Sequence, residues 1–131
     1  MNHKIKTAFI TGAANGIGKN IAQKLHEKGF NIVVTDIQEN LLVEVYSTFS
    51  KDKVLVLPLN VTQSNEWERA VNLSIEKFKT IDILLNIAGI IEPGYIHETT
   101  IKKIDSQIDI NLKGTIYGVH YVSQKMIENR S

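Results

Sequence analysis

The sequence predicts an α/β fold, in which a parallel sheet is covered by helices on both faces. Short apolar runs typical of buried strands alternate along the chain with longer stretches whose apolar residues recur at helical spacing. In addition, a glycine-rich segment, residues 11–18, lies directly between the first apolar run and the first helical stretch. The chain has 131 residues, of which 43% are hydrophobic. We therefore expect one domain that can bury a core.

Each strand is expected at a short apolar run, and there are four such runs: residues 7–10, 31–35, 54–57 and 81–85. The first helix should follow the glycine-rich segment and end at Gly29. Its apolar face would consist of Ile17, Ile21, Ala22 and Leu25. The second helix is expected over residues 38–50, with an inward face of Leu41, Leu42, Val45 and Phe49.

The third helix is expected to begin at a cap formed by Thr62 or Ser64. Its core face would consist of Trp67, Val71, Ile75 and Phe78. After a turn at 93–94, a last helix should run over about 100–128. Its apolar stripe would consist of Ile104, Ile108, Leu112, Ile116, Val119 and Met126. The expected sheet order is 3-2-1-4, the first half of a doubly wound, Rossmann-like parallel sheet.

The glycine-rich segment is predicted to bind an anion. A strand, a glycine turn and a helix together direct free backbone N–H groups and a helix N-terminus at a ligand. Gly12, Gly16 and Gly18 suit such a turn because glycine tolerates positive φ and lets a pyrophosphate approach the main chain. Asp36 closes the second apolar run twenty positions after Gly16, the separation at which dinucleotide-binding units carry an acid for the ribose. We therefore expect a dinucleotide here.

The spacing Gly-x-x-x-Gly-x-Gly, with Thr11 before its first glycine, resembles the cofactor loop of short-chain dehydrogenases/reductases. Asp36, the segment 86–89 (Asn-Ile-Ala-Gly) and the segment 111–114 (Asn-Leu-Lys-Gly) fit the same family in order and separation. The resemblance covers the whole chain and matches the N-terminal part of a family member, which is normally a longer protein. It implies that residues 1–131 are a single truncated NAD(P)-binding Rossmann domain.

The resemblance implies a set of cofactor-binding residues: Gly12, Asn15, Gly16, Ile17, Gly18, Asp36, Asn60, Val61, Asn86, Ala88 and Gly89. Asp36 would accept both ribose hydroxyls and repel a 2′-phosphate, and Asn15 and Ile37 are uncharged, so NAD is expected rather than NADP. Asn60 stands where the family commonly has Asp, but its amide can donate to and accept from adenine. Ile87 replaces the family's second Asn. Each feature has an alternative interpretation. The glycine loop could be an ordinary tight turn, Asp36 a helix-capping aspartate, and the segment 86–89 a generic strand terminus.

Asn111 is the catalytic candidate, because the matching Asn of the family helps to hold a water in a proton relay. The alternative is an Asn buried in an apolar helical face, satisfied locally and serving only packing. The family's Ser and Tyr-x-x-x-Lys are expected to be absent. Tyr121 and Lys125 have the right spacing, but Tyr121 would lie roughly 15 Å beyond Asn111 along one helix. General acid–base catalysis needs contact at about 3 Å, or through one water.

The resemblance thus implies NAD(H) binding within an oxidoreductase that transfers hydride between nicotinamide and a carbonyl/alcohol substrate. The chain alone is expected to be inactive, since the proton-transfer residues are expected to be absent. One alternative is a non-enzymatic dinucleotide-binding module or a degenerate fragment. A third reading is another Rossmann-like domain, such as a methyltransferase that uses a nucleoside cofactor.

Composition narrows the classes of partner. A net charge of +1 gives no electrostatic case for nucleic acid or an acidic membrane surface. The lack of cysteine excludes disulfides and is compatible with a cytoplasmic location, and the four histidines show no metal-ligand spacing. The first apolar run is too short for a signal peptide or a membrane span. Because an apolar stripe and a strand edge would otherwise be exposed, we expect a homo-oligomer through the last helix.

Overall fold

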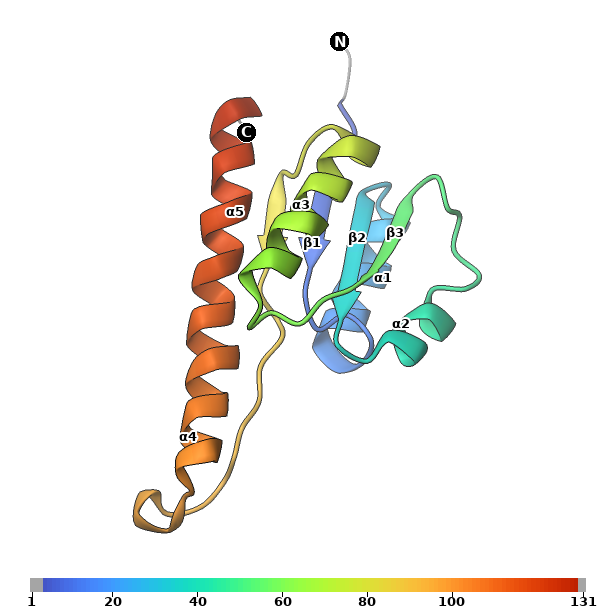
Figure 1. The fold of residues 1–131 in the computed structure, drawn as a ribbon. Helices are drawn as coiled ribbons and strands as arrows, with labels where there is room; N and C mark the ends of the chain where they lie inside the picture. Colours follow the sequence, from blue (N-terminus) through green and yellow to red (C-terminus); the bar gives the residue numbers. More distant parts are fainter. Residues whose placement is uncertain (1–3, 130–131) are drawn as a thin grey trace.

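Four parallel strands form the centre of the structure, a computed structural model that describes residues 4–129. Their order is β3-β2-β1-β4, which confirms the order expected from the sequence. The strands are β1 (Thr7–Ile10), β2 (Asn31–Asp36), β3 (Val54–Pro58) and β4 (Ile83–Leu85); Figure 1 shows their arrangement. Within the described residues, β4 pairs only with β1 and therefore forms an edge of the sheet.

β4 begins two residues later than the predicted run because Asp82 takes over part of the pairing. Asp82 Oδ2 accepts hydrogen bonds from Thr7 N (2.8 Å) and from Thr80 Oγ1 (2.9 Å). Asp82 N in turn donates to Thr7 O. A side-chain carboxylate therefore satisfies the first N–H of β1, and regular strand pairing begins only at Ile83.

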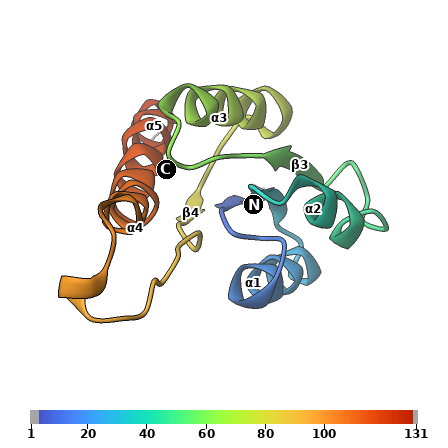
Figure 2. The same ribbon diagram turned by 60° about the horizontal axis from the view of Figure 1, so that its bottom comes forward.

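Helices cover both faces of the sheet, as expected for a doubly wound fold. α1 (Gly16–Glu27) and α2 (Glu39–Val45) lie on one face, while α3 (Ser64–Phe78) and α5 (Gly114–Asn129) lie on the other (Figure 2). Successive residues of β1 serve opposite faces: Ala8 and Ile10 pack with α1 and α2, and Phe9 packs with α3. Phe9 stacks on the fully buried Trp67, with ring centroids 5.5 Å apart. Strands buried on both faces explain the continuous apolar runs.

Two details of the first two helices differ from the expectation. Ile17, expected in the inward face of α1, is 70% exposed. α2 is also shorter than predicted, because the helix ends at Val45 and residues 46–48 form a turn. Phe49 nevertheless packs against the core from outside the helix, so the periodic spacing predicted its burial correctly but its secondary structure wrongly. Gly29 adopts a φ of +92° just beyond α1, which confirms the predicted helix end.

The predicted side-chain cap of α3 is wrong, because neither Thr62 nor Ser64 provides one. The N-cap position is Gln63, which makes no side-chain cap bond. The chain instead enters α3 through a turn in which Asn60 Oδ1 accepts from Thr62 N (3.0 Å) and Thr62 Oγ1 (2.7 Å). Glu66 Oε1 reaches back to accept from Asn60 N at 3.0 Å. The Asn60 turn thus orders the helix entrance that a cap would otherwise order.

The last helix, expected as one uniform element, has three parts. α4 (Ile101–Gln107) is followed by a π-helical turn, η2 (Ile108–Lys113), and then by α5. Thr100 caps α4, since its Oγ1 accepts from Lys103 N at 3.2 Å, and a short 3₁₀ helix, η1 (Ile96–Glu98), precedes it. The arm formed by α4, η2 and α5 extends well beyond the sheet (Figure 1).

The arm packs through small residues. Its buried residues are Gly114, Gly118 and Val122. A Cβ on Gly118 would stand 2.7 Å from Trp67 Cη2, and one on Gly114 would stand 2.7 Å from Val61 Cγ2. Four residues of the predicted apolar stripe are instead 45–56% exposed: Ile108, Leu112, Ile116 and Val119. Glycine allows α5 to approach Val61 and the α3 residue Trp67 closely, and the larger apolar side chains face outward.

Candidate functional site

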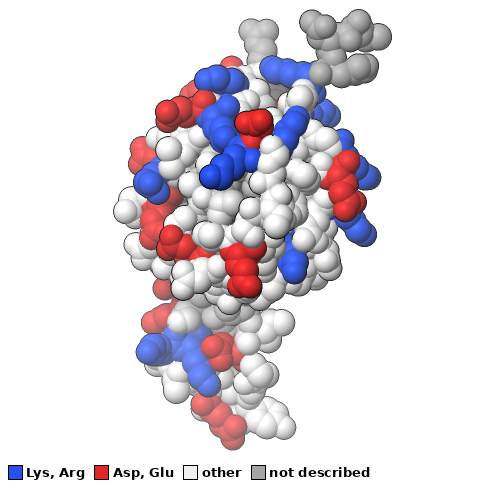
Figure 3. Space-filling view, turned by 90° about the vertical axis from the view of Figure 1, so that its right-hand side faces the viewer, with Lys and Arg blue, Asp and Glu red and all other residues white. Residues whose placement is uncertain are grey.

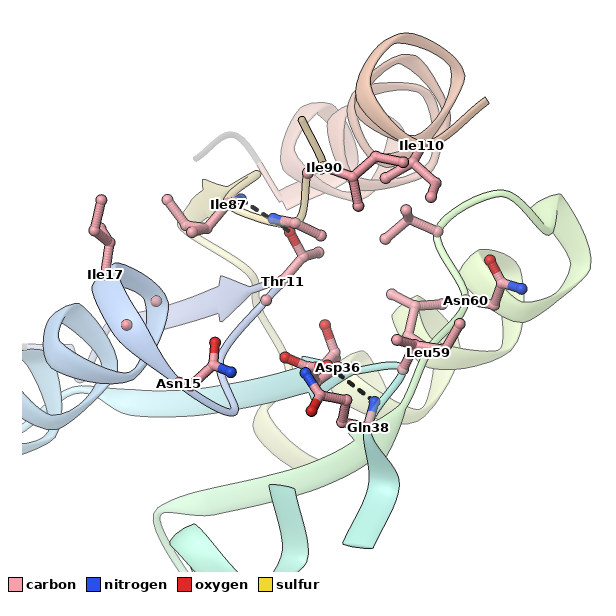
Figure 4. A pocket seen from close by; sticks show the side chains of 18 residues that line it. Thr11, Asn15, Ile17, Asp36, Gln38, Leu59, Asn60, Ile87, Ile90 and Ile110 are labelled. Carbon is pink, nitrogen blue, oxygen red and sulfur yellow. Dashed lines mark hydrogen bonds between the residues drawn. The ribbon is translucent and has the colours of Figure 1, made fainter. Parts of the chain in front are cut away.

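A cavity of about 350 Å³ opens at the carboxyl ends of β1, β2 and β4, where ligands bind in open α/β sheets. Figure 4 shows Asn15 and Asp36 on one side of it and Ile87, Ile90 and Ile110 on the other. Most of the expected cofactor-binding residues line this cavity: Gly12, Asn15, Gly16, Ile17, Gly18, Asp36, Asn60, Val61, Ala88 and Gly89. Asn86 and Asn111 are not among the lining residues.

Three glycines shape the loop at the mouth of the cavity. Gly12 has a φ of +64°, and a Cβ there would stand 2.9 Å from Ala88 N. A Cβ on Gly18 would collide with Gly12 O, so glycine is required where the helix starts against the loop. Gly16 has a φ of +56°, and a Cβ there would meet no atom within 4 Å. The space beside Gly16 is therefore open to a ligand rather than filled by the protein.

The first turn of α1 offers backbone N–H groups to this space. The N-terminal amides of a helix have no partner within the helix. Asn15 occupies the N-cap position without a side-chain cap bond, and no acidic residue lies in the first turn. The positive end of the helix dipole is therefore not neutralised by a carboxylate of that turn, and it favours a negatively charged ligand group.

Thr11 fixes the glycine loop to the end of β4. Its Oγ1 accepts hydrogen bonds from Ile87 N (2.9 Å) and Ala88 N (3.0 Å). Its backbone N–H donates to Leu85 O at 3.0 Å. Regular pairing of β1 with β4 ends at Leu85. Beyond that point the Thr11 hydroxyl binds the chain in its place, and it holds Ala88 against Gly12.

Asp36 is 93% buried at the end of β2, and two backbone donors orient its carboxylate. Oδ1 accepts from Gln38 N at 2.9 Å, and Oδ2 accepts from Ala14 N at 3.0 Å. Each carboxylate oxygen can accept a second hydrogen bond from a ligand. Among the residues that line the cavity, Asp36 is the only charged one.

No positively charged side chain among the residues that line the cavity compensates for Asp36. Figure 3 shows Lys, Arg, Asp and Glu side chains interspersed over one face of the molecule. Ile37, which follows Asp36, is 67% exposed and uncharged. Attraction for an anion in this cavity must therefore come from backbone N–H groups and the helix dipole rather than from a basic side chain.

Leu59, Asn60 and Val61 form the wall of the cavity next to β3. Both lone pairs of Asn60 Oδ1 are engaged, because it accepts from Thr62 N and from Thr62 Oγ1. Only the amide nitrogen of Asn60 is therefore left to pair with a ligand, which limits the expected pairing with adenine to donation. Leu59 and Val61 are almost fully buried and supply apolar surface.

The side chains of the segment 86–89 do not all face the cavity. Ile87, Ala88 and Gly89 line the cavity. Asn86 points to α5 instead, since its Oδ1 would stand 2.9 Å from a Cβ on Gly118. The structure therefore does not bring the expected Asn86 side chain into the cavity, and the small Ala88 and Gly89 form this part of its lining.

Asn111 braces the loop after β4. It lies in η2 and is exposed rather than buried. Its Oδ1 accepts from Ile90 N at 2.8 Å, and its Nδ2 donates to Ile90 O at 2.7 Å. Two hydrogen bonds to the Ile90 backbone, 21 positions away in the sequence, thus satisfy the side chain, which lacks the burial that the packing alternative expected. Its place in a proton relay stays a prediction.

Tyr121 and Lys125 lie on α5 and are not among the residues that line the cavity. Lys125 Nζ pairs with Glu128 at 3.5 Å. Within residues 4–129, no group of three or more His, Asp or Glu side chains is placed to hold a metal ion. In the same residues, every helix is too short or too polar to cross a membrane.

Sequence reasoning missed one residue near the loop, Tyr46. It follows α2, is 3% exposed, and donates from its hydroxyl to Ala13 O at 2.8 Å. Burial, and to a lesser extent the nearby Asp36 carboxylate, raise the pKa of the Tyr46 hydroxyl above its ordinary value. No motif or spacing rule points to this residue, because the contact joins positions 33 apart in the sequence.

The fold and the cavity define a Rossmann-like α/β domain with a glycine loop at the carboxyl ends of its strands. A family model described as short chain dehydrogenase matches residues 6–131. An uncharacterized oxidoreductase of Staphylococcus aureus (strain MW2) is 36% identical over 126 residues, covering 96% of this chain and 54% of the relative. The chain therefore belongs to the short-chain dehydrogenase/reductase family.

Two further comparisons agree with this assignment. Diacetyl reductase [(S)-acetoin forming] of Staphylococcus epidermidis (strain ATCC 12228) is 34% identical, covering 96% of this chain and 50% of the relative. A short-chain dehydrogenase/reductase of Burkholderia phymatum, solved in complex with NAD, matches with a TM-score of 0.93 at 24% identity, covering 98% of this chain and 46% of that one. This last likeness concerns the fold. The chain spans about half the length of the curated relatives it matches.

Proposed function

We propose that this chain is the NAD(H)-binding part of a cytoplasmic short-chain dehydrogenase/reductase. The whole enzyme would transfer hydride between nicotinamide and a carbonyl/alcohol substrate. The observation that carries the proposal is the pairing, in one cavity, of the open first turn of α1 with the single carboxylate of Asp36. A dinucleotide carries a matching group for each: a pyrophosphate for the first turn of α1 and a ribose diol for the Asp36 carboxylate.

The residues present fit the adenosine half of NAD. The N–H groups at Gly16, Ile17 and Gly18 would hold the pyrophosphate, because they begin α1 and line the cavity. Asp36 would accept from the ribose hydroxyls, and Leu59 and Val61 would contact the adenine. When bound, the nicotinamide supplies the hydride chemistry, while these residues bind and orient the cofactor.

The charge of the cavity supports NAD over NADP. A 2′-phosphate would lie against the Asp36 carboxylate and find no Lys or Arg among the lining residues. Calorimetric titration tests this: we expect NAD and ADP-ribose to bind more tightly than their 2′-phosphorylated counterparts. Equal or reversed preference would contradict the assignment.

We further propose that the chain alone binds the cofactor without measurable turnover. Apart from Asp36, the lining residues include no side chain with an acid–base function, and no Ser, Tyr or Lys among them. The name of the Staphylococcus epidermidis relative makes diacetyl the first carbonyl compound to assay with NADH. We expect background rates, and turnover abolished by Tyr121→Phe would show instead that the Tyr121–Lys125 pair is catalytic.

We also propose that the arm mediates self-association. The outward stripe of α5 and η2, defined by Ile108, Leu112, Ile116 and Val119, is about half exposed, and apolar surface of this kind marks interaction sites. β4 lies at the sheet edge beside the same arm, which leaves strand pairing as a second contact. Light scattering should detect a dimer or larger species, and a stable monomer at tens of micromolar, an order-of-magnitude concentration, would contradict it.

A further inference from the structure

The hydroxyl of Tyr46, a residue that follows α2, reaches the glycine loop between β1 and α1. Tyr46 follows the last residue of α2, and its ring packs edge-on against Phe49 with centroids 5.1 Å apart. The hydroxyl donates to Ala13 O at 2.8 Å. Ala13 lies in the turn between β1 and α1, and Tyr46 connects this turn to the chain that follows β2.

One peptide group of the loop is held at both ends. Its oxygen, Ala13 O, accepts from Tyr46, and its N–H, which belongs to Ala14, donates to Asp36 Oδ2 at 3.0 Å. Because a peptide group is planar, two hydrogen bonds on its opposite sides fix its rotation about the chain. The same bond fixes one oxygen of the Asp36 carboxylate.

This peptide group directly precedes Asn15 and the first turn of α1. Its orientation therefore sets the path by which the backbone enters the open N–H groups. Ala13 and Ala14 are both fully buried or nearly so, and water would not readily replace a lost Tyr46 hydroxyl as a donor. The ordinary pKa of a tyrosine hydroxyl already lies above the neutral range, and burial raises the pKa of Tyr46 further, so this hydroxyl stays protonated and remains a donor.

We propose that Tyr46 is a positioning residue for the ADP-ribose half of the cofactor. By holding the peptide group between Ala13 and Ala14, it maintains both the Asp36 carboxylate and the start of α1 in the arrangement that the ligand requires. This inference rests on the proposed NAD site. It assigns part of the affinity and of the 2′-hydroxyl selectivity to a residue that does not line the cavity.

The test compares Tyr46→Phe with Tyr121→Phe, which removes the same hydroxyl from α5, away from the loop. Each folded variant is titrated calorimetrically with ADP-ribose and with its 2′-phosphorylated counterpart. For Tyr46→Phe we expect ADP-ribose affinity to fall about 3- to 10-fold, the usual worth of one hydrogen bond, and the preference over the 2′-phosphorylated ligand to shrink. Tyr121→Phe should change neither quantity.

The outcomes separate positioning from packing and from the cofactor site itself. Unchanged affinity in folded Tyr46→Phe, or equal losses for both ligands with an unchanged preference, would overturn the positioning role. Phe49→Leu, which loosens the Tyr46 ring contact but removes no loop hydrogen bond, should leave the preference intact. If the unaltered chain fails to bind ADP-ribose, the proposed cofactor site is wrong and this inference falls with it.

A second measurement does not depend on the variant folding. Backbone amide exchange in the unaltered chain should be slow at Ala14 without ligand and should stay unchanged when ADP-ribose is added, because Tyr46 and Asp36 already hold that peptide group. Fast exchange that becomes slow only with ADP-ribose would mean that the ligand orders the loop, and would overturn the proposal.

Discussion

The glycine loop and the helical arm are built from the same chain in opposite ways. Around the loop, the end of β2 and the segments that follow α2 and β4 converge through hydrogen bonds that Thr11 and Asp36 accept and that Tyr46 donates. Along the arm, α5 packs mainly through the absence of side chains at Gly114 and Gly118, and its larger apolar residues face outward. The comparison teaches that the loop is held by hydrogen bonds within the chain, whereas the arm leaves larger apolar side chains exposed.

The largest effect is expected at the loop. Gly18→Ala places a Cβ against Gly12 O, a backbone atom that cannot move without the whole turn. We expect a loss of about 3 kcal/mol or more in the free energy of unfolding, measured by urea denaturation. Gly29→Ala is the matched control, because its Cβ meets nothing within 4 Å and only its φ of +92° is strained. A Gly18→Ala loss no larger than that of the control would show that the loop is more adaptable than its contacts indicate.

The second effect concerns the ligand rather than the fold. Asp36→Ala removes the carboxylate that accepts from Ala14 and Gln38 and that we propose accepts from the ribose. Hydrogen bonds to a charged group are worth about 1.5–3 kcal/mol, so ADP-ribose affinity should fall about 10- to 100-fold and the preference over its 2′-phosphorylated counterpart should shrink. Asp36→Asn, which keeps one oxygen acceptor, should lose less. Calorimetry that finds the preference unchanged in both variants would remove Asp36 from the selectivity.

A third prediction tests how the arm is packed. Gly118→Ala brings a Cβ within 2.7 Å of Trp67 Cη2, and Trp67 is fully buried and cannot move aside. We expect a loss of about 1–3 kcal/mol in unfolding free energy. His120→Ala, an exposed position on the same helix, should stay within about 0.5 kcal/mol. Equal stability of the two variants would show that α5 does not depend on close approach to α3.

The smallest effect on stability is expected on the outward stripe. The double variant Leu112→Lys, Ile116→Lys changes two side chains that are 56% and 53% exposed. Its unfolding free energy, extrapolated to a monomer, should change by about 0.5 kcal/mol or less, while light scattering should show loss of self-association. Lys substitutions that leave the assembly intact would move the interface away from this stripe and toward the β4 edge.

The sheet followed from the sequence because strand runs and helical spacing are local properties. Residues 7–10 and the order 3-2-1-4 needed only apolar periodicity and the connection rules of doubly wound folds. Trp67 was likewise predictable as core. The strand ends were less so, because Asp82 decides where β4 begins through a bond to Thr7, 75 residues away.

The site was predictable where its residues form a motif and not where they act through the fold. The glycines and Asp36 have a characteristic spacing, and the structure places them around one cavity. Tyr46 has no such spacing. Asn86 looked equivalent to its neighbours in the sequence, but its side chain lies against Gly118 of α5 instead of lining the cavity. Gly118 was overlooked and Gly114 was noted only within the segment 111–114, since glycine carries no apolar signal for packing.

The π-helical turn η2 sets the angular phase of the arm. A π turn contains one residue more than the α-helical repeat, so it offsets the residues before it from those after it by about 100°. Deleting a single residue within 108–113 would return α4 and α5 to one continuous phase. Asn111 would then leave Ile90, or Gly118 would leave Trp67, since one rotation cannot satisfy both contacts. The extra residue thus lets one end of the helix fit the cavity loop while the other end independently fits α3.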